Sequence, residues 1–265
     1  MNARNRRHHK GIGSDLLPNA GKADIHIHTS ASDGKPSPKE LLDYVERHTD
    51  LDVIAITDHD TVAGALEAKR IHDAGDYRFD LIVGQEVTSQ AGHILALFIE
   101  KEVPKERPAR ETVRHIHAQG GLAIAAHPLL TLKHIDPDML TADGVGVDVL
   151  MSEQFDGVEI VNGSPLMNDE NTRTRLLNRT VIFRAETGGS DAHIAEAVGK
   201  GYTLFPGATA EDFRRAVEQK TTEAVSTKYR IRELLKYLRF YTKIKFREFG
   251  RKAFGKVKRL RGAKS

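Results

Sequence analysis

Short apolar runs with the composition of β-strands recur along this chain, and a histidine or an acidic residue stands at or just after the end of most of them. The run at residues 53–56 leads into Asp58-His59-Asp60, and the run at residues 122–126 leads directly into His127. These runs alternate with segments of helical periodicity, which is typical of an α/β protein with parallel strands. Because the carboxyl ends of parallel strands meet on one side of a sheet, polar residues far apart in the sequence are expected to converge there.

Nine side chains fit this pattern as candidate metal ligands. In the segment Asp24-Ile25-His26-Ile27-His28, strand alternation sends both imidazoles to one face, where one cation can bind both. Imidazoles and carboxylates without thiolates suit zinc, manganese or iron. The nine candidates are His26, His28, Asp33, His59, Glu86, His93, His127, Asp191 and His193.

Five strings that carry these residues, in this order, resemble the polymerase and histidinol phosphatase (PHP) superfamily of metal-dependent phosphoesterases. They are His26-Ile27-His28, Thr57-Asp58-His59-Asp60, Glu86, Ala126-His127-Pro128 and Gly189-Ser190-Asp191-Ala192-His193. The resemblance covers residues 23–206. It implies an α/β fold, a distorted (β/α)7 barrel of the PHP type, with the metals at the carboxyl ends of the strands.

The resemblance also implies two or three divalent ions and how the ligands divide among them. The first ion would be held by His26, His28, Glu86 and Asp191, the second by Glu86, His93 and His127, and the third by Asp33, His59 and His193. Glu86 would bridge the first two ions. The string Ser32-Asp33-Gly34 resembles the branch that cleaves nucleotides and short oligonucleotides.

The expected activity is hydrolysis of a phosphate ester by a metal-bridged hydroxide, with Glu86, Asp191 and His193 closest to the chemistry. A nucleotide or the end of a short oligonucleotide is the favoured substrate. Three alternatives remain open: a phosphatase of a small metabolite such as histidinol phosphate, another metal-dependent hydrolase of the amidohydrolase kind, and a non-catalytic binding protein. The last is the least favoured, because all nine candidate ligands are present.

Candidate substrate contacts are Lys35, Asn162 and Arg173. Lys35 and Asn162 follow metal-site or strand segments and could therefore meet an anionic substrate. Arg173 and Arg175 are two apart on an expected helix, so at most one of them readily faces a phosphate, and a solvated helix face is the alternative. His115 and His117, also two apart on an expected helix, are predicted to be solvated.

Composition suggests one catalytic domain with basic ends. We expect a basic head at residues 1–22, a PHP catalytic domain at 23–227 and a basic amphipathic helical tail at 228–265. The absence of cysteine excludes disulfides, thiolate metal sites and a cysteine nucleophile. The sequence has neither a spanning apolar run nor the apolar core of a signal peptide, so a cytoplasmic protein is expected, with the tail as a route to a peripheral location at the membrane.

The tail differs sharply in charge from the rest of the chain. It holds 15 Lys and Arg against two acidic residues, whereas residues 1–227 hold 25 basic and 35 acidic residues. Its apolar residues fall at helical spacing: Ile231, Leu234, Leu235, Leu238, Tyr241 and Ile244. Three interpretations stay open, namely a helix packed on the barrel, an anionic membrane surface and a nucleic-acid backbone. The sequence does not identify a protein partner.

Several individual elements are also expected. Strands are predicted at residues 23–28 and 157–162. Helices are predicted from Pro38, capped by Ser37, and at residues 61–74 and 108–119.

Overall fold

A computed structural model describes residues 20–130 and 143–242, and the chain divides into two units, Met1–Thr227 and Lys228–Ser265. Within the described residues, the first unit is built on one mixed sheet of nine strands in the order β7-β6-β5-β4-β3-β2-β1-β8-β9. In chain order the strands are β1 Gly21–Asp24, β2 Val53–Ile56, β3 Asp80–Thr88, β4 His93–Leu97, β5 Leu122–Ala125, β6 Gly157–Asn162, β7 Ala185–Gly189, β8 Gly201–Phe205 and β9 Glu223–Ser226.

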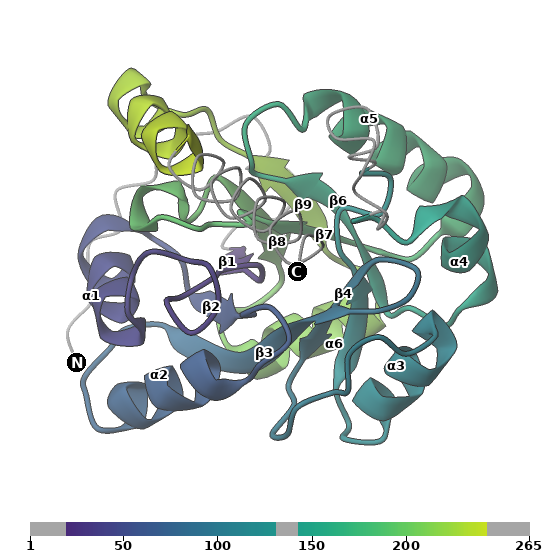
Figure 1. Cartoon of the computed structure of the whole chain (residues 1–265), viewed down its shortest axis with the longest axis horizontal. Coiled ribbons are helices and arrows are strands. Elements are labelled where there is room, and N and C mark those ends of the chain that lie inside the picture. Colours follow the sequence, from purple (N-terminus) through teal and green to yellow (C-terminus); the bar gives the residue numbers. More distant parts are fainter. Residues whose placement is uncertain (1–19, 131–142, 243–265) are drawn as a thin grey trace, which may run out of the picture. The chain divides into compact units, whose positions relative to one another are not determined.

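The helices are α1 Pro38–His48, α2 Ala63–Asp73, α3 Ala109–His117, α4 Gly146–Ser152, α5 Asn168–Leu177 and α6 Ala210–Glu218, with a π-helical turn at Asn178–Ile182 and a 3-10 turn at Ala195–Ala197. Helices α1 to α5 lie around the outside of the curved sheet (Figure 1).

Strands β1 to β7 curl into a nearly closed barrel. Beyond the ends of β1 and β7, Ile27 and Ala192 form a parallel bridge, so the two outer strands of this series meet. Strand β8 runs antiparallel to β1, and the Thr203 hydroxyl in β8 accepts a hydrogen bond from the Gly188 N–H in β7 at 2.9 Å. The expected barrel of the PHP type is therefore confirmed.

The expectation of parallel strands holds for only part of the sheet. Strands β1, β2 and β3 pair in parallel, as do β5, β6 and β7, but β4 runs antiparallel to both of its neighbours. Strands β3 and β4 are joined by a tight turn in which the Ser89 N–H donates to the Gly92 carbonyl at 3.0 Å. A turn this short permits an antiparallel pair, whereas a parallel pair requires a crossover of a dozen or more residues.

The local signals in the sequence place several elements correctly. Helix α1 begins at Pro38, and Ser37 and Glu40 form a reciprocal capping box at its start. Strand β6 has the predicted bounds, and α2 and α3 are shorter than predicted by a few residues. Strand β1 ends at Asp24 rather than His28, because the backbone beyond it pairs with the segment after β7, where the His28 N–H donates to the Ala192 carbonyl at 3.0 Å.

The interior of the barrel is apolar at the amino end of β1. Phe205 of β8 pairs with Gly21 at the start of β1, and Phe213 of α6 packs edge-on against Phe205 with ring centroids 5.5 Å apart. Both phenylalanines are fully buried in a cluster that includes Val53 and Ile82. Because this end is filled by apolar side chains, polar groups that face the interior can gather only at the carboxyl ends of the strands.

The second unit contains a helix at residues 231–242. Rings of Tyr229, Tyr237 and Tyr241 lie against one another, with centroids 5.9 and 5.7 Å apart. Most of the predicted basic head, and the tail beyond residue 242, lie outside the described residues. In the two described ranges, we find no helix with the length and apolar character needed to cross a bilayer.

Candidate metal centre

Eight of the nine candidate ligands lie at or after the carboxyl ends of β1, β2, β3, β5 and β7, and His93 opens the antiparallel strand β4 at the same end of the barrel. His26 and His28 follow β1, and both are fully buried with ring centroids 5.1 Å apart. His59 follows β2 and forms an isolated parallel bridge with Glu86 of β3. Strand closure thus brings together side chains that are up to 167 positions apart, from His26 to His193.

Glu86 is the centre of this arrangement, because its two carboxylate oxygens face different sets of imidazoles. Its Oε2 lies 3.1 Å from His26 Nε2 and 3.3 Å from His28 Nε2. Its Oε1 lies 2.9 Å from His93 Nδ1 and 3.1 Å from His127 Nε2. A single buried carboxylate is therefore placed to serve two neighbouring cation positions.

Two further carboxylates complete the centre. Asp191 Oδ1 lies 3.2 Å from His28 Nε2 and 3.6 Å from His26 Nε2. Asp33 Oδ2 lies 3.1 Å from His193 Nε2 and 3.9 Å from His59 Nε2. Among the described residues, four sets have ligand atoms within 4.8 Å of one another: His28, Asp33, His59 and His193; His26, Glu86 and His127; His26, His28 and Asp191; and His59, Glu86 and His93. All nine predicted residues belong to at least one set.

Several atoms of this cluster are buried without a hydrogen-bond partner. They are Nε2 of His26, both ring nitrogens of His28, Oε2 of Glu86 and Nδ1 of His93 and of His127. Leaving a buried polar atom unsatisfied costs about 1–3 kcal/mol, so such a concentration needs an explanation. Divalent cations provide one, because imidazole nitrogens and carboxylate oxygens together form the donor set of zinc, manganese and iron sites.

The electrostatics of the cluster concentrate negative charge on Glu86 and Asp191. Burial would raise the pKa of Glu86, but His59 and His26 hold it well below its usual range. Burial likewise opposes ionisation of Asp191, yet His26 and His28 keep its pKa well below the usual value. For His28 burial dominates and, with the nearby His193, lowers its pKa to about 4. Although burial lowers them, neighbouring carboxylates raise the pKa values of His93 and His193 to about 9, so metal binding at these imidazoles would displace protons.

Glu159 supports two of the ligands, and the sequence analysis did not include it in the site. This fully buried carboxylate lies with Oε1 2.9 Å from His26 Nδ1, and its Oε2 accepts a hydrogen bond from the His127 N–H at 2.8 Å. A carboxylate on the far ring nitrogen fixes the orientation of a metal-binding imidazole. The available signal was a charged residue inside the apolar run Val158-Glu159-Ile160, where it must be buried and needs partners.

Asp24 and Asp58 hold the backbone around the site. Asp24 accepts hydrogen bonds from the N–H groups of Ser190 and Gly199 at 2.9 and 2.8 Å. Asp58 accepts from the Thr29 N–H at 2.7 Å and from the Ser32 hydroxyl at 2.6 Å. Asp58 therefore positions the loop that carries Asp33.

The backbone is strained at two of the candidate ligands. His127 and Asp191 have positive φ angles of 25° and 52°, a region that non-glycine residues rarely adopt. Gly189 is required for a different reason, since a Cβ there would lie 2.5 Å from Cβ of His26 and 2.7 Å from Oε1 of Glu159. Strain and close approach of this kind tend to concentrate at functional sites.

The three predicted substrate contacts differ in environment. Lys35 and Arg173 are exposed, and Arg173 lies on α5. Asn162 is buried, and its side-chain amide donates to Asp191 Oδ2 and to Glu159 Oε2, both at 3.2 Å. Asn162 therefore orients the ligand Asp191, while a direct contact with substrate stays a prediction for all three residues.

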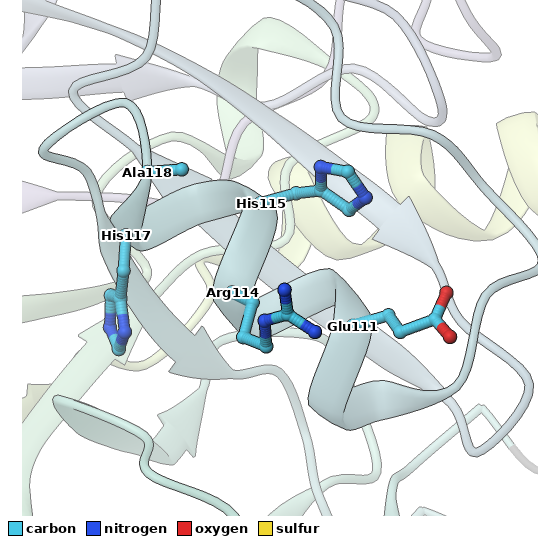
Figure 2. Close-up of a pocket in the computed structure, with 5 residues that line it drawn as sticks. All are labelled: Glu111, Arg114, His115, His117 and Ala118. Atoms are coloured by element: carbon cyan, nitrogen blue, oxygen red, sulfur yellow. The ribbon is translucent and has the colours of Figure 1, made fainter.

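A separate hollow of about 690 Å³ lies on the outer side of α3. Figure 2 shows the side chains that line it, Glu111, Arg114, His115, His117 and Ala118, and none of them belongs to the nine-residue cluster. His115 and His117 extend in different directions, as their spacing predicts, and both are exposed. His117 Nε2 lies 2.8 Å from Asp156 Oδ2, so its role is a surface ion pair.

Comparison with known proteins agrees with this architecture. The family described as PHP-associated matches residues 184–222, which include Asp191 and His193. An uncharacterized protein of Methanocaldococcus jannaschii is 33% identical over 149 residues, which are 52% of this chain and 85% of that protein. A 5′-3′ exoribonuclease of Haemophilus influenzae is 38% identical over 88 residues, which are 32% of this chain and 31% of that protein.

A solved structure provides a comparison over most of the fold. A two-domain protein of Bacteroides vulgatus that contains a predicted PHP-like metal-dependent phosphoesterase superposes with a TM-score of 0.61 and 19% identity, covering 90% of this chain and 74% of that one. The curved sheet, with histidine and carboxylate side chains gathered at one end of it, defines an α/β barrel with a candidate metal centre. The chain belongs to the PHP superfamily.

Proposed function

We propose that this protein is a metal-dependent phosphoesterase. The observation that carries the proposal is that Glu86 lies between two groups of imidazoles. Its Oε2 is 3.1 Å from Nε2 of His26, and its Oε1 is 3.1 Å from Nε2 of His127. Two oxygens of one carboxylate that serve two histidine sets are typical of a site for adjacent divalent ions. Bound ions would supply a water of lowered pKa as the nucleophile and would neutralise charge on the phosphate.

The protein's own residues would determine where the substrate approaches. His26 and His28 have no exposed side-chain surface, whereas the side chains of Asp33, His59 and His193 are 49%, 30% and 17% exposed. The set formed by Asp33, His59 and His193 therefore lies on the solvent side of the centre. A phosphate group that enters there would meet these residues first, with the buried Glu86 beneath it.

The favoured substrate class is a nucleotide or the end of a short oligonucleotide. Support comes from the string Ser32-Asp33-Gly34 and from the exoribonuclease of Haemophilus influenzae, whose similarity extends over 88 residues of this chain. The exposed Lys35 follows Asp33 closely, and its N–H donates to the His193 carbonyl at 2.8 Å. This contact keeps the Lys35 backbone next to the open side of the centre, where its ammonium group could pair with a phosphate.

The proposal is tested with purified full-length protein and its His26→Ala and Glu86→Ala variants. Hydrolysis of p-nitrophenyl phosphate, bis-p-nitrophenyl phosphate, nucleoside monophosphates and short RNA and DNA oligonucleotides would be measured with added Mn²⁺. Both variants are expected to lose turnover while they keep a cooperative thermal transition. The matched control is His115→Ala on the exposed side of α3, which is expected to retain the rate of the parent protein.

The same panel distinguishes the alternatives. Turnover of histidinol phosphate in preference to nucleotides would identify a small-metabolite phosphatase, and cleavage of amide or cyclic amide substrates without phosphatase activity would identify a hydrolase of the amidohydrolase kind. Retained phosphatase activity in Glu86→Ala would overturn the metal assignment.

A further inference from the structure

The described part of the tail, the helix at residues 231–242, carries an exposed apolar ridge. Ile231, Leu235 and Leu238 are spaced four and three residues apart and so lie on one face of the helix. Their exposed fractions are 79%, 61% and 48%. Large aliphatic side chains that share one face of a helix and remain in water indicate an interaction surface.

A row of positive charges runs beside this ridge. Arg232, Lys236 and Arg239 are also spaced four and three residues apart, and all three are exposed. Each ridge residue is offset from its basic neighbour by one or two positions, and one position on an α-helix is a rotation of about 100°. The apolar ridge and the basic row therefore occupy adjacent faces of the same helix.

Three tyrosine side chains of this unit pack against one another rather than over the ridge. Tyr237 is 7% exposed, and its ring lies against the rings of Tyr229 and Tyr241. Ile231 and Leu235 point away from this cluster, as their exposure shows. The described tail thus combines a packed tyrosine cluster with an aliphatic ridge that is exposed to solvent.

We infer that this helix lies in the plane of an anionic bilayer surface, with the ridge of Ile231, Leu235 and Leu238 among the acyl chains and the basic row against the lipid head groups. Helices with an aliphatic face, a basic polar face and low overall hydrophobicity bind membranes in this way. The tail has 15 basic and two acidic residues, which matches the charge of an anionic leaflet. A nucleic-acid backbone would engage the basic row but would leave the ridge in water, which makes it the less suitable occupant.

The inference concerns how the protein is located and does not depend on the proposed reaction. An α-helix rises about 1.5 Å per residue, so the described residues 231–242 are fewer than a bilayer-spanning helix needs. The remaining tail sequence continues the same composition, with Phe246, Phe249 and Phe254 among lysines and arginines.

The test exploits the absence of tryptophan from the chain. In full-length Leu235→Trp protein, the new residue is the single tryptophan and reports on the ridge. With vesicles of equal parts phosphatidylcholine and phosphatidylglycerol, its emission is expected to shift to the blue and to be quenched by brominated lipid. Leu66→Trp, at an exposed leucine on α2 of the first unit, is the matched control and is expected to show little shift. Vesicles of phosphatidylcholine alone are expected to leave both emissions unchanged.

A second measurement separates insertion from simple charge attraction. Leu235→Glu/Leu238→Glu full-length protein is expected to co-sediment with the anionic vesicles at least tenfold less than the parent, whereas Leu66→Glu, a partly exposed leucine on α2, is expected to bind as the parent does. A cooperative thermal transition in each variant shows that the fold is intact. Equal co-sedimentation of parent and double variant, or an unshifted Leu235→Trp emission in bound protein, would overturn the inference. So would binding to a single-stranded oligonucleotide without any binding to vesicles.

Discussion

Oε1 of Glu159 lies 2.9 Å from Nδ1 of His26, and both side chains are fully buried. A proton at Nδ1 would donate to this carboxylate and leave Nε2, which lies 3.1 Å from Glu86 Oε2, as the nitrogen that could bind a metal ion. The other oxygen of Glu159 accepts a hydrogen bond from the His127 N–H. A single carboxylate on β6 therefore holds two candidate ligands, His26 after β1 and His127 after β5.

Removing the charge of Glu159 should weaken metal binding without removing a ligand. In Glu159→Gln the amide retains the size of the side chain but no longer accepts at both oxygens, so the orientation of His26 and His127 is less well fixed. We expect Mn²⁺ affinity, measured by isothermal titration calorimetry, to fall about 10- to 100-fold. Glu211→Gln, at an exposed position on α6, is the control. An unchanged affinity in Glu159→Gln would show that His26 needs no such partner.

Loss of Asp33 should have a smaller effect on metal content than loss of Glu86. Glu86 lies within about 3 Å of imidazoles in two sets, whereas Asp33 belongs only to the open set with His59 and His193. We expect elemental analysis of Asp33→Ala to show about one ion fewer than the parent, and Glu86→Ala to lose at least two. Equal losses in the two variants would contradict the division of the cluster into distinct ion positions.

Two Gly→Ala substitutions separate backbone strain from lack of space. Gly120 has a φ of +73° with nothing within 4 Å of an added Cβ, so Gly120→Ala should cost about 1 kcal/mol in unfolding free energy through strain alone. At Gly189 the added Cβ would meet His26 and Glu159. We expect Gly189→Ala to be more destabilising in urea unfolding and to weaken Mn²⁺ binding, while Gly120→Ala leaves binding unchanged. Normal metal affinity in Gly189→Ala would argue against this close approach.

Asp212 should make stability depend on pH in the acid range. Hydrogen bonds from the N–H groups of Ala208 and Thr209, at the start of α6, lower the pKa of Asp212 to about 2 from its ordinary value of 3.8. Because the folded-state pKa is depressed, this stabilisation is fully present above pH 4 and is lost as pH falls toward 2.

The measurement compares melting temperatures of the parent and Asp212→Asn between pH 6 and the lowest pH at which both remain folded. The variant is expected to melt lower at pH 6, with the difference shrinking as pH falls below 4. Glu211→Gln removes a charge from the same turn without removing the cap and is the control. A difference that stays constant with pH would show that the cap does not depend on the ionised carboxylate.

Truncation after Lys245 tests whether the end of the tail supports catalysis. The chain divides into units at Thr227 and Lys228, and the nine candidate ligands all precede this boundary. We expect hydrolysis of a small phosphate ester to be largely retained in the truncated protein. A collapse of the thermal transition would instead show that residues 246–265 stabilise the barrel.

The sequence predicted the barrel and the site best where the signal was local and repeated. Capping by Ser37 fixed the start of α1, and apolar runs followed by histidine or carboxylate identified nine residues that the structure brings together. The direction of β4 was missed because the turn after Ser89 resembles other loops in composition, and only its length distinguishes a hairpin from a crossover.

The sequence by itself determined which side chains are available to the centre, because residue type and position relative to a strand are local properties. Tertiary structure alone decided the partners: that Glu86 presents one oxygen to His26 and the other to His127, and that Glu159 lies against Nδ1 of His26. These pairings depend on the curvature of the sheet and on the contact between the segments after β1 and β7. Such distances are set by the packing of the whole barrel, which no short stretch of sequence encodes.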